Sequence, residues 1–190
     1  AELGYQGDIW LVNPRHREIE GRRCHPSVRD LPRVPDATFV AVSAAATIEV
    51  VAELAALGAG AAVCYASGFS EVGAAGRALE EDLVNAAGAL ALVGPNCLGV
   101  FNNLDRVCLG FGGSPPPGLG RGPAVVSQSG TIPTVMDWNR RSLEFAFVAS
   151  IGNSPVIRAS DLIELLADDP RITAIAVHVE GIADTPAFVR

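Results

Sequence analysis

The sequence contains no lysine, and all 14 of its basic residues are arginine. This absence excludes a P-loop lysine that grips a nucleotide phosphate, and it excludes a lysine Schiff base. A phosphate bound by these residues must be held by backbone N–H groups, helix N-termini or arginine. Codon bias is the better single explanation of an arginine-only, alanine-rich composition. The absence of lysine therefore limits the chemistry without identifying it.

Basic residues are also too few for a nucleic-acid partner, because the net charge is −7 and the pI is near 4.9. No apolar run reaches the roughly 18 residues of a membrane span, so no membrane partner is expected. The chain opens Ala1-Glu2-Leu3-Gly4, which does not resemble a signal peptide. Hydrophobic residues make up 49% of the 190 residues, enough to bury the core of one domain or two small ones.

Histidine and cysteine are sparse and scattered. The four cysteines form no C-x-x-C pair and there are only three histidines, so no metal site is expected. His16 and His25 lie in polar segments without an obvious partner, and His178 is interpreted as packed. Reduced thiols fit a cytoplasmic protein best.

Short apolar or β-branched runs alternate with helical patterns along the chain. The alternation predicts an α/β fold, in which parallel sheets carry helices on both faces. Strands are predicted at residues 8–13, 37–43, 61–66, 89–93, 123–127, 145–150 and 172–179. Helices are predicted at residues 47–57, 71–87, 131–141 and 160–167, the last capped by Ser160.

Proline and glycine dominate the segment GGSPPPGLGRG (112–122), which is the best linker in the chain. We therefore expect two parallel-sheet units, at residues 1–113 and 121–190. Both look incomplete. The first lacks the usual opening strand with its glycine-rich turn, and the second has only three predicted strands.

Ligands of open parallel sheets bind beyond the carboxyl ends of the strands, so the segments after each strand are the candidate sites. The segment Ser127-Gln128-Ser129-Gly130-Thr131 is the sharpest, because a strand ends and small residues open a helix there. Free N–H groups and the helix dipole at that point can hold a phosphate. An ordinary N-cap with a tight turn explains the same residues equally well.

Other strand ends leave two interpretations open. Asn96 and Cys97 could meet a ligand, although a turn with a buried cysteine is the commoner case. Arg15 could bind an anion or be solvated. Glu180 could orient a histidine or a metal, or lie in a surface loop. No G-x-G-x-x-G is present, so a dinucleotide site has no direct support.

Six stretches taken together are specific. They are GYQGDIWLVNP (4–14), ASGFSEVG (66–73), VGPNCLGVFN (93–102), VVSQSGTI (125–132), SIGNSPV (150–156) and VEGI (179–182). With them the chain resembles the NDP-forming acyl-CoA synthetases and, more distantly, the α subunit of succinyl-CoA synthetase. The resemblance implies a Rossmann-like CoA-binding domain followed by a partial flavodoxin-like ligase domain. It also implies interconversion of acyl-CoA, phosphate and NDP with free acid, CoA and NTP.

The resemblance assigns roles to the strand-end residues. Those implied to bind CoA are Asn13, Pro14, Arg15, Ser43, Ser67, Gly68, Phe69, Asn96 and Cys97. Those implied to bind phosphate are Ser127, Ser129, Gly130 and Thr131. Glu180 matches the glutamate that hydrogen-bonds the family's phosphohistidine and keeps its tautomer fixed.

Departures from the family pattern limit what this chain could do alone. Ser43 stands where the family usually has proline, and none of the three histidines matches the phosphorylated one. The resemblance implies ATP/ADP and Mg²⁺ only through an ATP-grasp domain or subunit outside this chain, so we expect the chain alone to be inactive. The sequence leaves open which acyl group is transferred and whether the nucleotide is ADP or GDP. It also leaves open whether the chain forms a homo-oligomer. The alternative function is a non-catalytic acyl-CoA-sensing module of a protein acetyltransferase; an NAD(P)-binding Rossmann protein is a weaker third.

Overall fold

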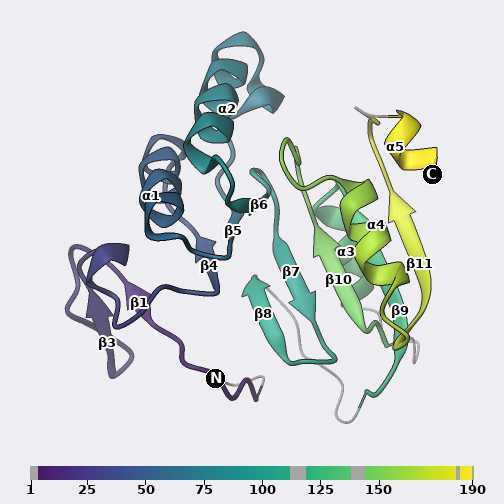
Figure 1. The fold of residues 1–190 in the computed structure, drawn as a ribbon, viewed down its shortest axis with the longest axis horizontal. Helices are drawn as coiled ribbons and strands as arrows, with labels where there is room; N and C mark the ends of the chain where they lie inside the picture. Colours follow the sequence, from purple (N-terminus) through teal and green to yellow (C-terminus); the bar gives the residue numbers. More distant parts are fainter. Residues whose placement is uncertain (1–3, 112–118, 138–143, 183–184, 190) are drawn as a thin grey trace.

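Three sheets organise the chain (Figure 1). The structure is a computed structural model that describes residues 4–111, 119–137, 144–182 and 185–189. A small sheet joins β1 (Leu11–Val12), β3 (Arg22–His25) and β2 (Glu18–Ile19) in that order. A second joins β4 (Ala37–Val40), β5 (Ala61–Cys64) and β6 (Ala91–Val93). The third has the order β11 (Ile172–His178), β9 (Gly122–Ser127), β10 (Phe147–Ser150), β7 (Gly99–Asn102) and β8 (Val107–Gly110).

The second sheet is parallel, and alternate residues of its strands face two different cores. Ala62 and Cys64 of β5 pack with Leu54 of α1 (Ala44–Leu57) and Leu83 of α2 (Ala74–Ala87). Val63 instead belongs to a core shared with the third sheet. Both helices thus cover one face of this sheet, whereas the sequence predicted helices on both.

Backbone hydrogen bonds explain where the two helices begin and end. α1 begins at Ala44, before the predicted start at residue 47, because the Ser43 carbonyl already accepts a hydrogen bond from Thr47 N at 2.8 Å. The helix ends at Gly58, as the sequence predicts. The helix predicted over 71–87 is divided by Gly73 into a 3₁₀ turn η2 (Ser70–Val72) and α2.

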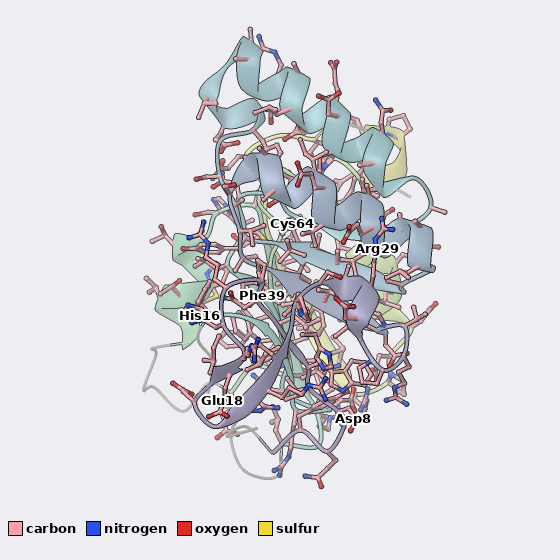
Figure 2. The ribbon with its side chains drawn as sticks, turned by 90° about the vertical axis from the view of Figure 1, so that its left-hand side faces the viewer. Asp8, His16, Glu18, Arg29, Phe39 and Cys64 are labelled. Carbon is pink, nitrogen blue, oxygen red and sulfur yellow. The ribbon has the colours of Figure 1, made fainter. Side chains whose placement is uncertain are left out.

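The small sheet is attached beside α1. The strand predicted over 8–13 is shorter than expected, and Leu11 and Val12 pair in parallel with Cys24 and His25 of β3. The 3₁₀ helix η1 (Val28–Asp30) follows β3, and Arg29 Nε lies 3.0 Å from Glu53 Oε1 of α1. Figure 2 views the molecule from this side, with Arg29 next to α1.

The third sheet carries helices on both faces, as predicted for an α/β unit. β9, β10 and β11 are parallel, and Figure 1 shows α4 (Ala159–Ala167) in front of them and α3 (Thr131–Asp137) behind. α5 (Thr185–Val189) follows β11. The predicted cap of α4 is wrong. Arg158 is the N-cap residue, its N–H donates to Asp161 Oδ2 at 2.7 Å, and Ser160 lies in the first turn. No helix within the described ranges is long and apolar enough to cross a bilayer.

The antiparallel hairpin β7–β8 was not predicted. It extends the third sheet, because β7 pairs with β10 from Phe147↔Asn102 to Ser150↔Gly99. Residues 112–118 of the predicted linker lie outside the described residues, as does the end of the helix predicted over 131–141. The hairpin precedes that linker in sequence yet belongs to the sheet that follows it.

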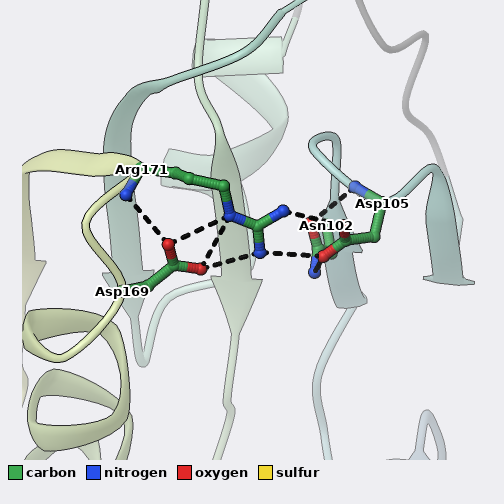
Figure 3. Close-up of polar contacts among 4 residues, drawn as sticks. All are labelled: Asn102, Asp105, Asp169 and Arg171. Carbon is green, nitrogen blue, oxygen red and sulfur yellow. Dashed lines mark hydrogen bonds and ion pairs between the residues drawn. The ribbon is translucent and has the colours of Figure 1, made fainter.

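One arginine secures the hairpin turn to the turn before β11 (Figure 3). Arg171 Nη1 lies 2.8 Å from Asp105 Oδ1, and Arg171 Nη2 lies 2.8 Å from Asp169 Oδ2. Asn102 Nδ2 also donates to Asp105 Oδ2 at 2.8 Å. The hydrogen bonds from Arg171 lower the pKa of both Asp105 and Asp169 below the usual value. Both carboxylates are thus held ionised against the same guanidinium.

This arrangement predicts an acid-sensitive contribution to stability. A carboxylate with a lowered folded-state pKa stabilises the fold above its unfolded pKa of about 3.9, and that stability is lost as the pH falls through the lower folded value. We expect Asp105→Asn to lower the thermal midpoint at neutral pH but to reduce its further fall below about pH 4. Thermal unfolding followed by circular dichroism across this range measures both effects. Asp8→Asn, which removes a more exposed ion pair with Arg33, is the control. An unchanged acid slope in Asp105→Asn would contradict the assignment.

Candidate functional site

The predicted phosphate segment is a turn between β9 and α3. Ser127 is buried and its Oγ donates to the Ser129 carbonyl at 2.8 Å, so its side chain shapes the turn. α3 begins at Thr131, and Thr134 Oγ1 donates to the Gly130 carbonyl at 3.0 Å. Backbone N–H groups in the first turn of a helix have no partner within the helix. Ser129, Gly130 and Thr131 can therefore offer N–H groups to an anion, whereas the hydroxyl of Ser127 is already used.

Gln128 joins this turn to the end of β11, a role that sequence analysis did not assign to it. Its Oε1 accepts hydrogen bonds from Glu180 N at 2.6 Å and Gly181 N at 3.0 Å, and its Nε2 donates to the Gly181 carbonyl at 3.0 Å. The two strands are neighbours in the sheet, with Ser127 opposite His178. Gln128 thus fixes the Glu180 backbone beside the start of α3.

Glu180 and His178 differ in how they are placed. Glu180 is exposed, so its carboxylate can meet a group that approaches from outside. His178 is half-buried, and its Nδ1 is buried without a hydrogen-bond partner among the described residues. The second observation agrees with the prediction that His178 is packed.

The loops after β9 and β10 lie where the strand order of the third sheet reverses. From β9 the chain crosses by α3 to β10 on one side, and from β10 it crosses by α4 back to β11 on the other. Ligands of open α/β sheets favour such a reversal of strand order. A small pocket opens here, lined by Gln128, Gly181 and the first turn of α4 among others. No three His, Cys, Asp or Glu side chains gather as a metal site in the described ranges.

The first group of predicted CoA residues lies after β1. Asn13 Oδ1 accepts hydrogen bonds from Arg15 N at 2.9 Å and His16 N at 3.2 Å, which closes a tight turn. Pro14 and Arg15 are exposed on this turn. Figure 2 labels His16 at its end. The turn leaves the Arg15 guanidinium open to an anion.

The second group lies after β4 and β5. Ser43 is exposed at the start of α1, and Ser67 is exposed beyond β5. The N–H groups of Gly68 and Phe69 both donate to Glu71 Oε1, at 2.5 and 3.2 Å. The Phe69 side chain is fully buried in the core with α1 and α2, so Phe69 can meet a ligand only through its backbone. Sequence analysis did not single out Glu71, which organises this loop.

Cys97 is part of the core, as one of the two sequence interpretations proposed. It is 2% exposed, and its Sγ lies 3.3 Å from the Cys64 carbonyl oxygen. Burial raises the pKa of the Cys97 thiol to about 12, so it stays protonated at neutral pH and is not a nucleophile. Asn96 is exposed beside it, and its N–H donates to the Ala66 carbonyl at 2.8 Å. The loops after β5 and β6 therefore lie together.

Two family models match the chain. The model described as a CoA binding domain matches residues 1–103, and the model described as a succinyl-CoA ligase like flavodoxin domain matches residues 121–190. The chain belongs to the CoA binding domain family. The fold of this family member is accordingly a Rossmann-like unit joined to a partial flavodoxin-like unit.

Relatives of this CoA-binding chain are ligases. It is 36% identical to acetate–CoA ligase [ADP-forming] I of Archaeoglobus fulgidus, and the match covers 98% of this chain and 27% of that protein. It is 32% identical to the α subunit of acetate–CoA ligase [ADP-forming] I of Pyrococcus furiosus, covering 99% and 42%. A solved structure of Ca. Korarchaeum cryptofilum dinucleotide forming acetyl-coenzyme A synthetase 1 with phosphate and ADP is 29% identical, with a TM-score of 0.88 and coverage of 96% and 39%.

These matches confirm the resemblance to NDP-forming acyl-CoA synthetases and favour the ligase over the regulatory alternative. The chain spans less than half the length of each of these three relatives.

Proposed function

We propose that this chain is the CoA-binding part of an NDP-forming acyl-CoA synthetase, an acid–thiol ligase that interconverts acyl-CoA, phosphate and NDP with free acid, CoA and NTP. The observation that carries the proposal is the Gln128 bridge, because it holds the Glu180 backbone beside the turn that opens α3. A carboxylate next to a phosphate-binding turn suits the transfer of a phosphoryl group through a histidine.

The reaction begins with phosphate attacking the thioester carbonyl carbon. The carbon–sulfur bond breaks, CoA leaves as a thiolate, and an acyl phosphate forms. A histidine then attacks phosphorus, and the acid leaves as a carboxylate. Backbone N–H groups of Ser129, Gly130 and Thr131 stabilise the phosphoryl oxygens without any lysine, while Ser127 shapes their turn. Glu180 accepts a hydrogen bond from the histidine and fixes its tautomer.

We infer that the histidine comes from outside residues 1–190. His25 is buried, His178 is packed in the edge strand β11, and His16 lies in the turn assigned to CoA. An ATP-grasp domain or subunit would then bind ATP/ADP and Mg²⁺ and charge the nucleotide. The buried free thiols of Cys24, Cys64 and Cys97 agree with a cytoplasmic location for the whole enzyme.

We propose that the predicted CoA residues bind CoA in the way that their exposure and contacts allow. Arg15 would pair with a CoA phosphate from the turn of Asn13 and Pro14, and Ser43 and Ser67 would line the edge of the site. Gly68 and Phe69 would contribute backbone. Asn96 would lie near the pantetheine thiol, with Cys97 supporting it from the core. We propose the same division of the chain as before, into a CoA-binding unit over 1–113 and a ligase unit over 121–190.

Titration calorimetry on the intact protein tests the proposal. We expect CoA and acetyl-CoA to bind with one site per chain and NAD to give no heat of binding. Arg15→Ala is expected to weaken CoA by about tenfold or more, because a hydrogen-bonded ion pair is lost. Arg17→Ala, at an exposed arginine two residues further on, is the matched control. Binding of NAD in the absence of CoA binding would exclude the proposed function.

A further inference from the structure

Asn153 connects three loops that belong to two sheets. It lies after β10, in the loop that leads to α4. Its Nδ2 is 2.7 Å from Glu71 Oε2, 2.7 Å from Glu80 Oε2 and 3.0 Å from Ser70 Oγ. These acceptors belong to η2 and α2, beside the second sheet. Asn153 N also donates to the Pro95 carbonyl at 3.0 Å, in the loop after β6.

Three acceptors surround the side-chain nitrogen of Asn153. A side-chain amide has two N–H donors, and the two shortest contacts are those with Glu71 and Glu80. Ser70 Oγ has its own proton, which it gives to Glu80 Oε2 at 2.8 Å. Asn153 Oδ1 faces the other way and accepts from Asn96 Nδ2 at 3.4 Å. A reversed amide would place its oxygen against two carboxylates, so the orientation is determined by charge.

The Glu71 carboxylate bridges Asn153 and the backbone of the loop after β5. One oxygen accepts from Asn153, and the other accepts from the N–H groups of Gly68 and Phe69. Burial opposes ionisation of Glu71, but the hydrogen bonds from Asn153 and from these N–H groups outweigh it and lower its pKa. The carboxylate stays charged at neutral pH and orders the loop that starts with Ser67.

We propose that Asn153 is a positioning residue for CoA, because it holds the Glu71 carboxylate and through it the backbone of Gly68 and Phe69. This inference rests on the proposed function, which places CoA along that loop. It assigns a CoA-binding effect to a residue of the third sheet, whose own loops are proposed to hold phosphate. Asn153 also lines the small pocket that Gln128 and Gly181 line.

Substitutions that change the donor pattern test the inference in the intact protein. Glu71→Gln keeps an acceptor for Gly68 and Phe69 but turns a donor toward the Asn153 amide. Asn153→Asp places a third carboxylate against Glu71 and Glu80. We expect each to weaken CoA by about tenfold or more in calorimetry, because residues 153 and 71 then no longer pair as donor and acceptor. Glu81→Gln, at an exposed position of the same helix α2, is the matched control and should bind as the parent does.

A rescue experiment separates positioning from a general loss of structure. The triple variant Asn153→Asp, Glu71→Gln, Glu80→Gln reverses donor and acceptor in the contacts of residue 153 with residues 71 and 80, and we expect it to recover most of the CoA affinity. Tight CoA binding by either single variant would overturn the inference, as would a triple variant no better than Asn153→Asp. If the parent protein itself binds no CoA, the proposed function fails instead. Glu71 lies at the surface, so Glu71→Gln tests the inference even if Asn153→Asp does not fold.

Discussion

Replacing Gly152 with alanine is expected to lower the free energy of unfolding by about 3 kcal/mol or more. A Cβ atom at this position would lie 2.1 Å from the Pro95 carbonyl oxygen and 2.4 Å from the Asn96 carbonyl oxygen. The φ angle of +56° adds the strain that any L side chain meets in the left-handed region. Overpacking and backbone strain each cost about 1–3 kcal/mol. Urea unfolding monitored by circular dichroism measures the change.

Gly58→Ala is the control for this prediction. Gly58 has a φ of +73°, but nothing lies within 4 Å of its ideal Cβ position, so its substitution carries only the backbone strain. We expect it to cost about 1 kcal/mol. The difference between the two variants measures how closely the loop after β10 approaches the loop after β6. Equal losses would show that this approach contributes nothing to stability.

Glu180→Gln in the whole enzyme is expected to reduce phosphohistidine formation by about 10- to 100-fold. Glutamine offers a weaker, uncharged acceptor, so the histidine loses the charge-assisted hydrogen bond that sets its tautomer. Labelling with γ-phosphate-labelled ATP follows the step directly. CoA affinity should be unchanged, because Glu180 follows β11 of the third sheet, whereas the proposed CoA loops follow strands of the other two sheets.

The matched variant is Glu164→Gln, at an exposed position on α4. It removes the same charge from the same sheet without touching the turn that Gln128 holds. Normal labelling in Glu180→Gln would remove Glu180 from the proposed role and leave the Gln128 bridge as a structural contact only. Reduced labelling in both variants would point to net charge as the cause.

Periodicity predicted the parallel strands well, because β5, β9 and β10 are buried and read as continuous apolar runs. It failed for the hairpin of β7 and β8, whose residues followed the Gly94-Pro95 turn without alternation strong enough to signal a strand. Pairing with β10 supplies what the local sequence lacks. The break in the helix predicted over 71–87 has a similar origin. Gly73, with a φ of +99°, separates η2 from α2, and Gly76 lies so close to the Phe69 carbonyl that a side chain would have no room there.

The candidate site shows the same division between local and long-range information. The loops with Ser129, Gly130 and Glu180 were predicted because ligands bind beyond the carboxyl ends of parallel strands, and the ends of the strands could be predicted from the sequence. The residues that join those loops were missed. Gln128 reaches Gly181 across two strands, and Asn153 reaches Glu71 and Glu80 across two sheets. A contact between residues so far apart in sequence has no local signature. Glutamine and asparagine also carry no charge that would mark them as candidate site residues.

The hairpin also determines how the chain can be divided. Phe101 of β7 packs with Val125 of β9 and Val148 of β10, so the first unit contributes both an edge and a core residue to the second. A backbone cut between Gly110 and Gly122 would break no strand pairing among the described residues. The two resulting peptides would still share the β7–β10 pairing and the core of Phe101, Val125 and Val148. Separately expressed, the C-terminal peptide would present β10 as an open edge, a template for pairing with other chains.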